Sequence, residues 1–223
     1  MSRGFGWPEL QFVLHGLLWT LGLSAVALTA GGVGGMIIAL ARVSRLRVLR
    51  IVAGGYIGLF QGTPVLMQLF LAFFGLAVLT GVQMDAWPAV TLAFTLYAGA
   101  FLGEIWRGAI QAVPPEQWEA ARALGLRRPA TLLRVVLPQA VRLAIPPTVG
   151  FLVQLIKSTA VASIIGFVEV TRAGQLMVNV TFRPMLVYPL VALLYFAVCW
   201  PVSLLAGRLE RRLDARGSGS PRR

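Results

Sequence analysis

Four long stretches of this 223-residue chain contain no Asp, Glu, Lys or Arg, and they limit its fold more than any other feature. They are residues 10–41, 51–84, 86–103 and 184–207. Because a helix needs about 20 mostly apolar residues to cross the hydrocarbon core of a bilayer, each stretch can hold a crossing. The chain is 57% hydrophobic and only 13% charged. The sequence therefore predicts an all-α integral membrane protein.

Five transmembrane helices are expected. Their ranges are about 11–41, 64–79, 87–112, 147–167 and 186–207. The second uncharged stretch needs a break, because as one helix it would be ~51 Å long, against a hydrocarbon core of ~30 Å. Gly62 and Pro64 in "FQGTPVL" provide that break. A proline opens the third span at Trp87-Pro88, and Pro146-Pro147 is expected to open the fourth.

Most of the basic residues of this chain, whose net charge is +12, form three clusters near the ends of the expected spans. The clusters are Arg42, Arg45, Arg47 and Arg50; then Arg107, Arg122, Arg127, Arg128 and Arg134; then Arg208, Arg211, Arg212 and Arg216. The positive-inside rule places these clusters in the cytoplasm, with the N-terminus outside and the C-terminus inside. We interpret the arginines as topology signals and lipid-headgroup contacts, and not as a nucleic-acid surface.

Catalytic and metal-binding patterns are missing from the sequence. One cysteine, Cys199, and one histidine, His15, exclude a disulfide framework and a Cys/His metal cluster. A nucleotide-binding P-loop needs Gly-Lys-Ser/Thr, yet the only lysine, Lys157, follows Ile156. The glycines of "GGVGG" at 31–35 indicate close helix packing instead. We expect no enzyme activity, metal site or cofactor in this chain.

A polar stretch at residues 114–138 is too long for a simple connection. Pro114-Pro115 ends the third helix and starts a new one, whose early carboxylates complement the helix dipole. Gly125 stands where a left-handed C-terminal cap is needed, and a second short helix is expected to end at Pro138. Trp118, Leu124 and Leu126 would give this projection apolar surface for a partner. The alternative is a helix that lies on the bilayer surface.

The stretch resembles the EAA loop of ABC importer permeases. That pattern reads Glu-Ala-Ala, three residues, Gly, nine residues, Ile, one residue, Leu-Pro, and here it matches Glu119-Ala120-Ala121, Gly125 and Val135-Val136-Leu137-Pro138. Other stretches resemble permeases of the polar amino acid uptake family, of the histidine/glutamine/arginine type. These are "FQGTPVLMQLFLAFFGL" (60–76), "GEIWRGAIQAVPPEQWEAARALGL" (103–126), "IKSTAVASIIGFVEVTRAGQ" (156–175) and "RLERRL" (208–213).

The resemblance implies the transmembrane permease subunit of an ATP-driven importer of polar amino acids in the bacterial inner membrane, with type I architecture. The coupling helix would lie in a groove of a cytosolic ATP-binding subunit, which would bind ATP and Mg²⁺. The coupling residues would be Glu119, Ala120, Ala121, Gly125 and Leu126. The other partners would be a second ATP-binding subunit, a second permease chain (identical or different) and an extracytoplasmic amino-acid-binding protein.

On this reading the chain has three parts. Residues 1–10 are an extracytoplasmic N-terminal segment, and residues 11–207 form the permease domain, which includes the coupling loop at 114–138. Residues 208–223 form a cytoplasmic tail that begins as a helix and ends in a disordered Gly/Ser-rich segment.

The substrate path is expected to involve seven residues: Gln61, Gly62, Thr63, Glu104, Lys157, Ser158 and Thr159. Lys157 would lie ten residues into a helix that starts near Pro147, about 15 Å deep, where a charge usually faces a cavity or a partner. It could attract a substrate carboxylate, form a structural pair with Glu104, or reach water through a break in the helix. Glu104 shares a helix face with Arg107, so the two could form an intrahelical pair, bind the amino group of a substrate or act in gating.

Two departures from the family pattern bear on the substrate. Gln61 replaces an arginine that often precedes Gly-Thr-Pro, and Lys157-Ser158-Thr159-Ala160 stands where Lys-Asp-Thr-Ser is common. Two other functions stay open beside the importer: a secondary transporter or channel that works alone, and a membrane scaffold that recruits a cytosolic protein. An importer requires a partner ATPase, a lone transporter requires none, and a scaffold moves no solute.

Overall fold

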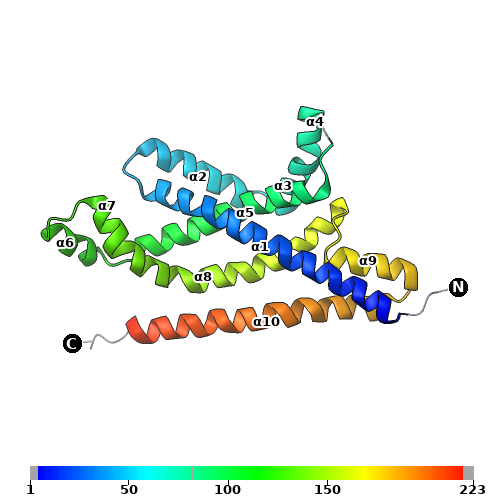
Figure 1. Cartoon of the computed structure of the whole chain (residues 1–223). Coiled ribbons are helices and arrows are strands. Elements are labelled where there is room, and N and C mark those ends of the chain that lie inside the picture. The colour runs from blue at the N-terminus through cyan, green and yellow to red at the C-terminus, as the bar shows by residue number, and fades with distance from the viewer. Residues whose placement is uncertain (1–4, 82, 218–223) are drawn as a thin grey trace.

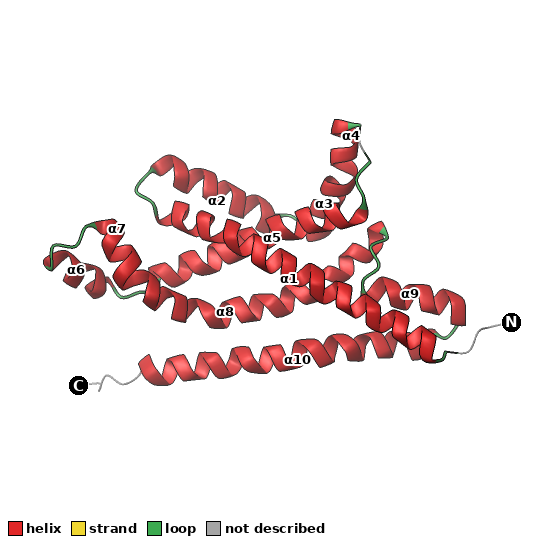
Figure 2. Cartoon of the chain, viewed as in Figure 1, coloured by secondary structure: helices red, strands yellow, loops and turns green. Residues whose placement is uncertain are grey.

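The computed structural model describes residues 5–81 and 83–217 and contains no strand in this part of the chain (Figure 2). In chain order the elements are α1 (Trp7–Val43), α2 (Arg47–Gly62), α3 (Val65–Phe70), the π-helix η1 (Leu71–Gly75), α4 (Leu76–Thr80), α5 (Ala86–Gln111), α6 (Pro115–Ala123), α7 (Arg128–Thr131), the π-helix η2 (Leu132–Val136), α8 (Leu137–Ser158), the 3₁₀ helix η3 (Thr159–Ile165), α9 (Val170–Thr181) and α10 (Pro184–Gly217).

Four helical segments are long and apolar enough to cross a membrane. They are Trp7–Val43, Ala86–Gln111, Arg128–Ile165 and Pro184–Arg211. A fifth crossing exists if α2 and the arm Val65–Thr80 count as one broken span, bent by 104°. This agrees with the expected five spans and with the expected break at Gly62–Pro64. A break of this kind is tolerated in a membrane only where the chain itself satisfies the backbone groups it frees.

The side chain of Gln68 satisfies the broken end of α2. Its Nε2 donates to the carbonyl oxygens of Phe60 (2.8 Å) and Thr63 (3.0 Å) and to Oγ1 of Thr63 (3.1 Å). Thr63 Oγ1 in turn donates to the carbonyl of Leu59 (2.8 Å). Gln68 is buried, so these bonds form away from water, where an unpaired carbonyl is costly. The bend is therefore held by a single amide side chain.

The expected start of the fourth span at Pro146-Pro147 is wrong. Both prolines lie inside α8, which runs without interruption from Leu137 to Ser158 and continues the helical segment that begins at Arg128. Interior prolines are tolerated in membrane helices because neighbouring groups compensate for the missing donors. The structure therefore joins the second short helix of the polar stretch directly to the fourth span.

Close packing of α1 on α5 is made possible by glycines. A Cβ added at Gly31 would lie 2.6 Å from Cβ of Ala98, and one at Gly35 would lie 3.0 Å from the backbone nitrogen of Gly103. Neither position has room for a side chain, so the two backbones come nearly into contact, as small residues allow in membrane helices. The interpretation of "GGVGG" as a packing motif is confirmed at these two positions.

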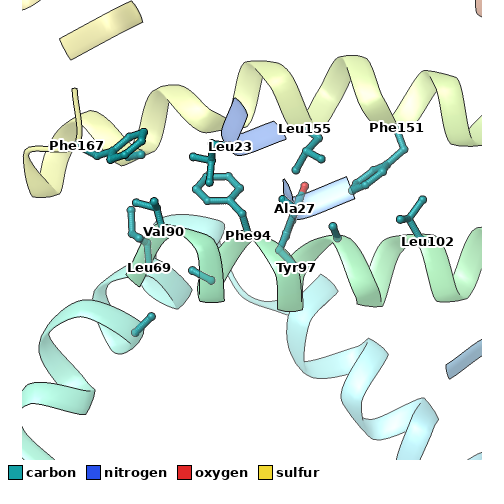
Figure 3. Packing of buried hydrophobic residues seen from close by; sticks show 14 residues of the cluster. Leu23, Ala27, Leu69, Val90, Phe94, Tyr97, Leu102, Phe151, Leu155 and Phe167 are labelled. Atoms are coloured by element: carbon teal, nitrogen blue, oxygen red, sulfur yellow. The ribbon is translucent and has the colours of Figure 1, made fainter. Parts of the chain in front are cut away.

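The main core lies where α1, α5 and α8 meet. Figure 3 shows side chains from these helices facing one another, with Phe94 and Tyr97 of α5 turned toward Leu23 of α1 and Leu155 of α8. Two cross-helix hydrogen bonds set the register of α5 against α8. Trp106 Nε1 donates to Thr148 Oγ1 (3.0 Å), and Gln154 Nε2 donates to the hydroxyl of Tyr97 (3.0 Å).

A buried carboxylate joins three elements at the N-terminal end of the molecule. Glu169 is fully buried and caps α9, accepting hydrogen bonds from the backbone N–H groups of Thr171 and Arg172 (both 2.8 Å). The hydroxyl of Tyr195 in α10 also donates to it (3.0 Å). The hydroxyl oxygen of Thr20 in α1 accepts from the N–H of Val170 (3.2 Å). None of the helices expected from the sequence corresponds to α9.

The ends of the chain differ in detail from the expected division. Residues 7–10, expected to precede the first span, belong to α1, and the helical start of the C-terminal tail is the last part of α10. Residues 218–223, expected to be disordered, lie outside the described residues.

Replacement of Gly31 by alanine should separate α1 from α5. Overpacking costs about 1–3 kcal/mol, and we expect the Tm of the detergent-purified chain to fall by several degrees. Gly34→Ala is the matched control, because a Cβ there meets nothing within 4 Å. Equal Tm values for the two variants would contradict the close contact.

Stability should depend on pH through Glu169, because burial raises the pKa of its carboxyl above the usual 4.5. Between pH 4.5 and the raised value, the folded protein holds a proton that the unfolded chain has lost. The stability from this group is therefore present at low pH and lost as pH rises through that window. We expect the Tm of the native chain to fall relative to that of Glu169→Gln as pH rises from about 4.5.

The comparison provides its own control for general pH effects. The native chain and Glu169→Gln share every other titrating group, so general pH effects cancel in the difference between their Tm values. A difference that stays flat over this range would show that the buried carboxyl does not titrate with folding.

Candidate functional site

The three arginine clusters gather at one end of the molecule, here called the basic end. The α1–α2 turn, α6, α7 and the C-terminal part of α10 lie at this end, opposite the N-terminus and α9 (Figure 1). Segments far apart in the sequence thus present their positive charge together. No group of three or more His, Cys, Asp or Glu side chains in the described part of the chain could hold a metal ion.

The helix α6 ends in a left-handed glycine, as expected. Gly125 has a φ of +75°, its N–H donates to the carbonyl of Arg122 (2.9 Å), and the N–H of Leu126 donates to that of Ala121 (3.1 Å). This pair of bonds is the Schellman motif, which closes a helix where the next residue adopts the left-handed conformation. A Cβ at Gly125 would meet nothing within 4 Å, so only the backbone conformation requires glycine there.

The residues of α6 divide into an inward and an outward set. Ala121 is buried, and Trp118 packs against the cluster formed by Ile110, Val113 and Val136 together with its neighbours. Trp118 therefore offers less surface to a partner than expected, because it is only partly exposed. The outward set faces away from the core: Glu119 and Ala120 are exposed, Leu126 is partly exposed, and Leu124 is 81% exposed.

A π-helical turn connects the α6–α7 corner to the long helix α8. Pro138 has no N–H to offer the carbonyl of Arg134, and in the preceding turn the N–H of Leu137 donates to the carbonyl of Leu132, five residues back. The side chain of Gln139 further links the two elements, since its Nε2 donates to Oε1 of Gln117 (3.3 Å). The helical segment that crosses the membrane thus begins at Arg128, and α6 is joined to it by the turn at residues 124–127 and by the bond from Gln139 to Gln117.

The residues at the helix break that were predicted to line the substrate path lie at the surface of the chain. Gln61 and Gly62 are exposed at the end of α2, and Thr63 is the C-cap whose backbone and hydroxyl are held by Gln68. Leu59, Phe60 and Thr63 also line a mostly apolar cavity of about 280 Å³ beside α5.

Glu104 and Lys157, expected as possible partners, do not pair. Glu104 forms a salt bridge with Arg107 on its own helix, which confirms the intrahelical alternative. The bonds from Trp106 to Thr148 and from Gln154 to Tyr97 fix the register of the two helices. In this register Lys157 of α8 lies beside a part of α5 about ten residues, or roughly 15 Å, from Glu104. The two groups therefore belong to different parts of the molecule.

Lys157 faces a groove between α8 and α10. It is exposed and lines a cavity of about 290 Å³ with Tyr195, Cys199 and Ser203 among its other walls. Its expected depth of ten residues is wrong, because α8 begins at Leu137, not near Pro147. Ser158 and Thr159 donate to backbone carbonyls of Gln154 and Ile156, and Thr159 is fully buried.

Three polar residues of structural importance were missed by the sequence analysis: Gln68, Glu169 and the buried part of Arg42. Gln68 follows the Gly-Thr-Pro break by one turn, a spacing that could have suggested a cap. Glu169 is the only acidic residue between Glu119 and Glu210, and this isolation in an apolar region could have indicated a structural role. Nothing in the sequence points to the contacts of Arg42 with α2.

Curated relatives match nearly the whole chain. It is 39% identical over 209 residues to the L-cystine transport system permease protein TcyB of Bacillus subtilis (strain 168), covering 93% of this chain and 88% of that protein. It is 33% identical over 207 residues to the putative glutamine transport system permease protein GlnP of Rickettsia conorii (strain ATCC VR-613 / Malish 7), covering 93% and 95%.

Solved structures match the fold. The crystal structure of an amino acid ABC transporter with histidines superposes with a TM-score of 0.85 at 33% identity, covering 94% of this chain and all of that one. An inward-facing structure of the MetNI methionine ABC transporter has a TM-score of 0.77 at 19% identity, with coverage of 93% and 99%, which supports the fold alone.

The family model described as the inner membrane component of binding-protein-dependent transport systems matches residues 31–216. This range contains the α6 loop, the helix break and all but the first of the membrane-crossing segments in full. The resemblance stated from the sequence is thereby confirmed, together with the type I importer fold. The chain belongs to the family of binding-protein-dependent transport system inner membrane components, the permease subunits of ABC importers.

Proposed function

We propose that this chain forms the membrane path of an ATP-driven importer for polar amino acids. The support is its similarity over 93% of its length to permeases named for cystine and glutamine, together with a fold shared with an amino acid ABC transporter. The cargo is a polar amino acid, whose carboxylate is the group common to every member of that class.

The proposed assembly contains two permease chains, two ATP-binding subunits and an extracytoplasmic amino-acid-binding protein. ATP and Mg²⁺ bind to the ATP-binding subunits, and this chain catalyses no reaction. The basic end faces the cytoplasm, since positively charged loops favour that side of a bacterial inner membrane. The N-terminus then lies outside and the C-terminus inside.

The single observation that carries the coupling proposal is the shape of α6 and its connection to α8. Its outward face holds Glu119, Ala120 and Leu124, and the Schellman turn at Gly125 fixes its angle to the following helix. Leu126 adds a partly exposed contact beyond that turn. We assign the outward face to a groove in the ATP-binding subunit.

Lys157 is proposed as the residue that attracts the substrate carboxylate. It forms no salt bridge within the described residues, and it faces a cavity. A charge in a membrane span is costly unless it meets a partner or water, and a passing carboxylate meets that need. Gln61, Gly62, Thr63 and the Glu104 region are assigned to the wall of the path, and Ser158 and Thr159 support Lys157 from the helix end.

The importer is tested by uptake of labelled amino acids in a strain that lacks this gene. Complementation with the native gene should restore uptake of one or a few polar amino acids. Gly125→Val should abolish most of it, because a β-branched residue in the left-handed region costs about 1–2 kcal/mol and opens the α6 corner.

Gly125→Asn is the matched control, because asparagine tolerates the left-handed region, and it should retain most of the uptake. Copurification with the ATP-binding subunit should follow the same order. Uptake that persists when no ATP-binding subunit is present would favour the lone transporter. Copurification with a cytosolic protein, without any uptake, would favour the scaffold.

Replacement of Lys157 by methionine should raise the KM for uptake at least about tenfold, since it removes one charge-assisted hydrogen bond to the carboxylate. Lys157→Arg keeps the charge and should retain most of the activity. Comparable protein levels and ATP-binding-subunit copurification must be shown for both. Unchanged uptake by Lys157→Met would remove this residue from the path.

A further inference from the structure

An arginine-lined cavity of about 470 Å³ lies between the α1–α2 turn and α6. Its basic residues are Arg42, Arg45, Arg50, Arg122 and Arg128, and its single acidic residue is Glu119. The charged residues come from α1, α2, α6, α7 and the α1–α2 turn, so the fold itself brings these charges together. A volume of this size is typical of a small-molecule site.

The positive charge in this cavity is only partly offset by the chain, which supplies one carboxylate, that of Glu119, to its wall. None of its five arginines forms a salt bridge within residues 5–81 and 83–217. Arg42 Nη1 donates to the carbonyl of Arg50 (3.2 Å) and Arg128 Nη2 to that of Val43 (3.4 Å), which leaves most guanidinium donors free. Arg42 Nε is buried and has no hydrogen-bond partner. These features call for an anion with several acceptor oxygens.

An apolar groove of about 480 Å³ adjoins the cavity and shares walls with it. Val43, Ser44, Arg45, Arg128 and Leu132 line both spaces. The groove adds Leu40 of α1 and Pro129 of α7, and it carries little polar surface. A charged chamber continuous with an apolar groove fits an amphiphile, whose anionic head and hydrocarbon tail have different solvation needs.

We propose that this composite site binds an anionic phospholipid. The phosphodiester lies among the guanidinium groups of Arg42, Arg45 and Arg128, and an acyl chain follows the groove past Leu40. Arginine suits this task, because its planar fork donates two parallel hydrogen bonds to phosphate oxygens. Basic pockets of this kind beside membrane helices bind lipid head groups in other proteins.

The bound lipid connects the α1–α2 turn to the α6–α7 corner. Arg45 lies in the turn, Arg122 is in the last turn of α6, and Arg128 starts α7. The lipid therefore adds a bridge between two parts of the basic end that already meet through the bond from Arg128 to Val43 and through the packing of Val43 beside Leu132. This site goes beyond the proposed function and does not depend on which amino acid is carried.

The test is a titration of the detergent-purified full-length chain with short-chain phosphatidylglycerol, read by native mass spectrometry. The double variant Arg45→Gln/Arg128→Gln should bind about 25-fold more weakly, at about fivefold for each basic residue lost. Arg134→Gln/Arg142→Gln removes the same net charge outside both spaces and should bind like the native chain. Circular dichroism and gel filtration establish that both variants are folded.

Three further measurements separate the lipid from other ligands. Short-chain phosphatidylcholine, which has no net charge, should bind at least tenfold more weakly to the native chain. Glycerol 3-phosphate and inorganic phosphate should also bind weakly, because neither uses the groove. Leu40→Asp should weaken phosphatidylglycerol binding while leaving glycerol 3-phosphate binding unchanged, since Leu40 lines only the groove.

Each opposite result overturns the proposal. Equal loss in the two double variants would mean that net charge alone attracts the lipid. Equal binding of the two phospholipids would exclude an anion site. Soluble phosphates that bind as tightly as phosphatidylglycerol would assign the cavity to a soluble anion instead of a lipid.

Discussion

The structure depends on one requirement: a peptide group inside a bilayer must find its hydrogen-bond partner within the chain. Continuous helices meet the requirement over most of the membrane-crossing length. At the break after α2, where the chain bends by 104°, a continuous helix cannot supply the donors. The amide of Gln68 supplies them instead, because its Nε2 donates to two carbonyls and one hydroxyl at the end of α2. Without this one side chain, the bend would expose carbonyls to an apolar environment.

The same requirement explains how the prolines are accommodated. The π-turn before Pro138 shifts the backbone bonds by one residue, so that Leu137 pairs with Leu132. Downstream, Pro146 and Pro147 leave the carbonyls of Arg142 and Leu143 without their helical donors, and both of these residues are exposed at the surface of α8. Once the backbone is satisfied, packing decides the arrangement. The glycines of α1 allow it to approach α5 closely, and the core of α1, α5 and α8 forms around that contact.

The sequence was informative where the signal was local. Uncharged stretches predicted the membrane helices, Gly62 and Pro64 the break, and Gly125 the end of α6, because each depends on a few neighbouring residues. Pro146-Pro147 misled the analysis, since a proline pair can open a helix or lie inside one. The inward turn of Trp118 and the link from Thr20 to Val170 depend on residues distant in the sequence, and the single sequence carries no sign of them.

The uninterrupted helical segment from Arg128 to Ser158 has a mechanical consequence. It measures about 45 Å at ~1.5 Å per residue, and a helix is far stiffer along its axis than a loop of equal length. In the proposed importer, an axial displacement at one end would therefore reach Lys157 at the other with little loss, and the π-turn at Leu132–Val136 is where the helical hydrogen-bond pattern changes. The length of the continuous helix thus sets how far such a displacement would extend, and the packing of its side chains sets the direction.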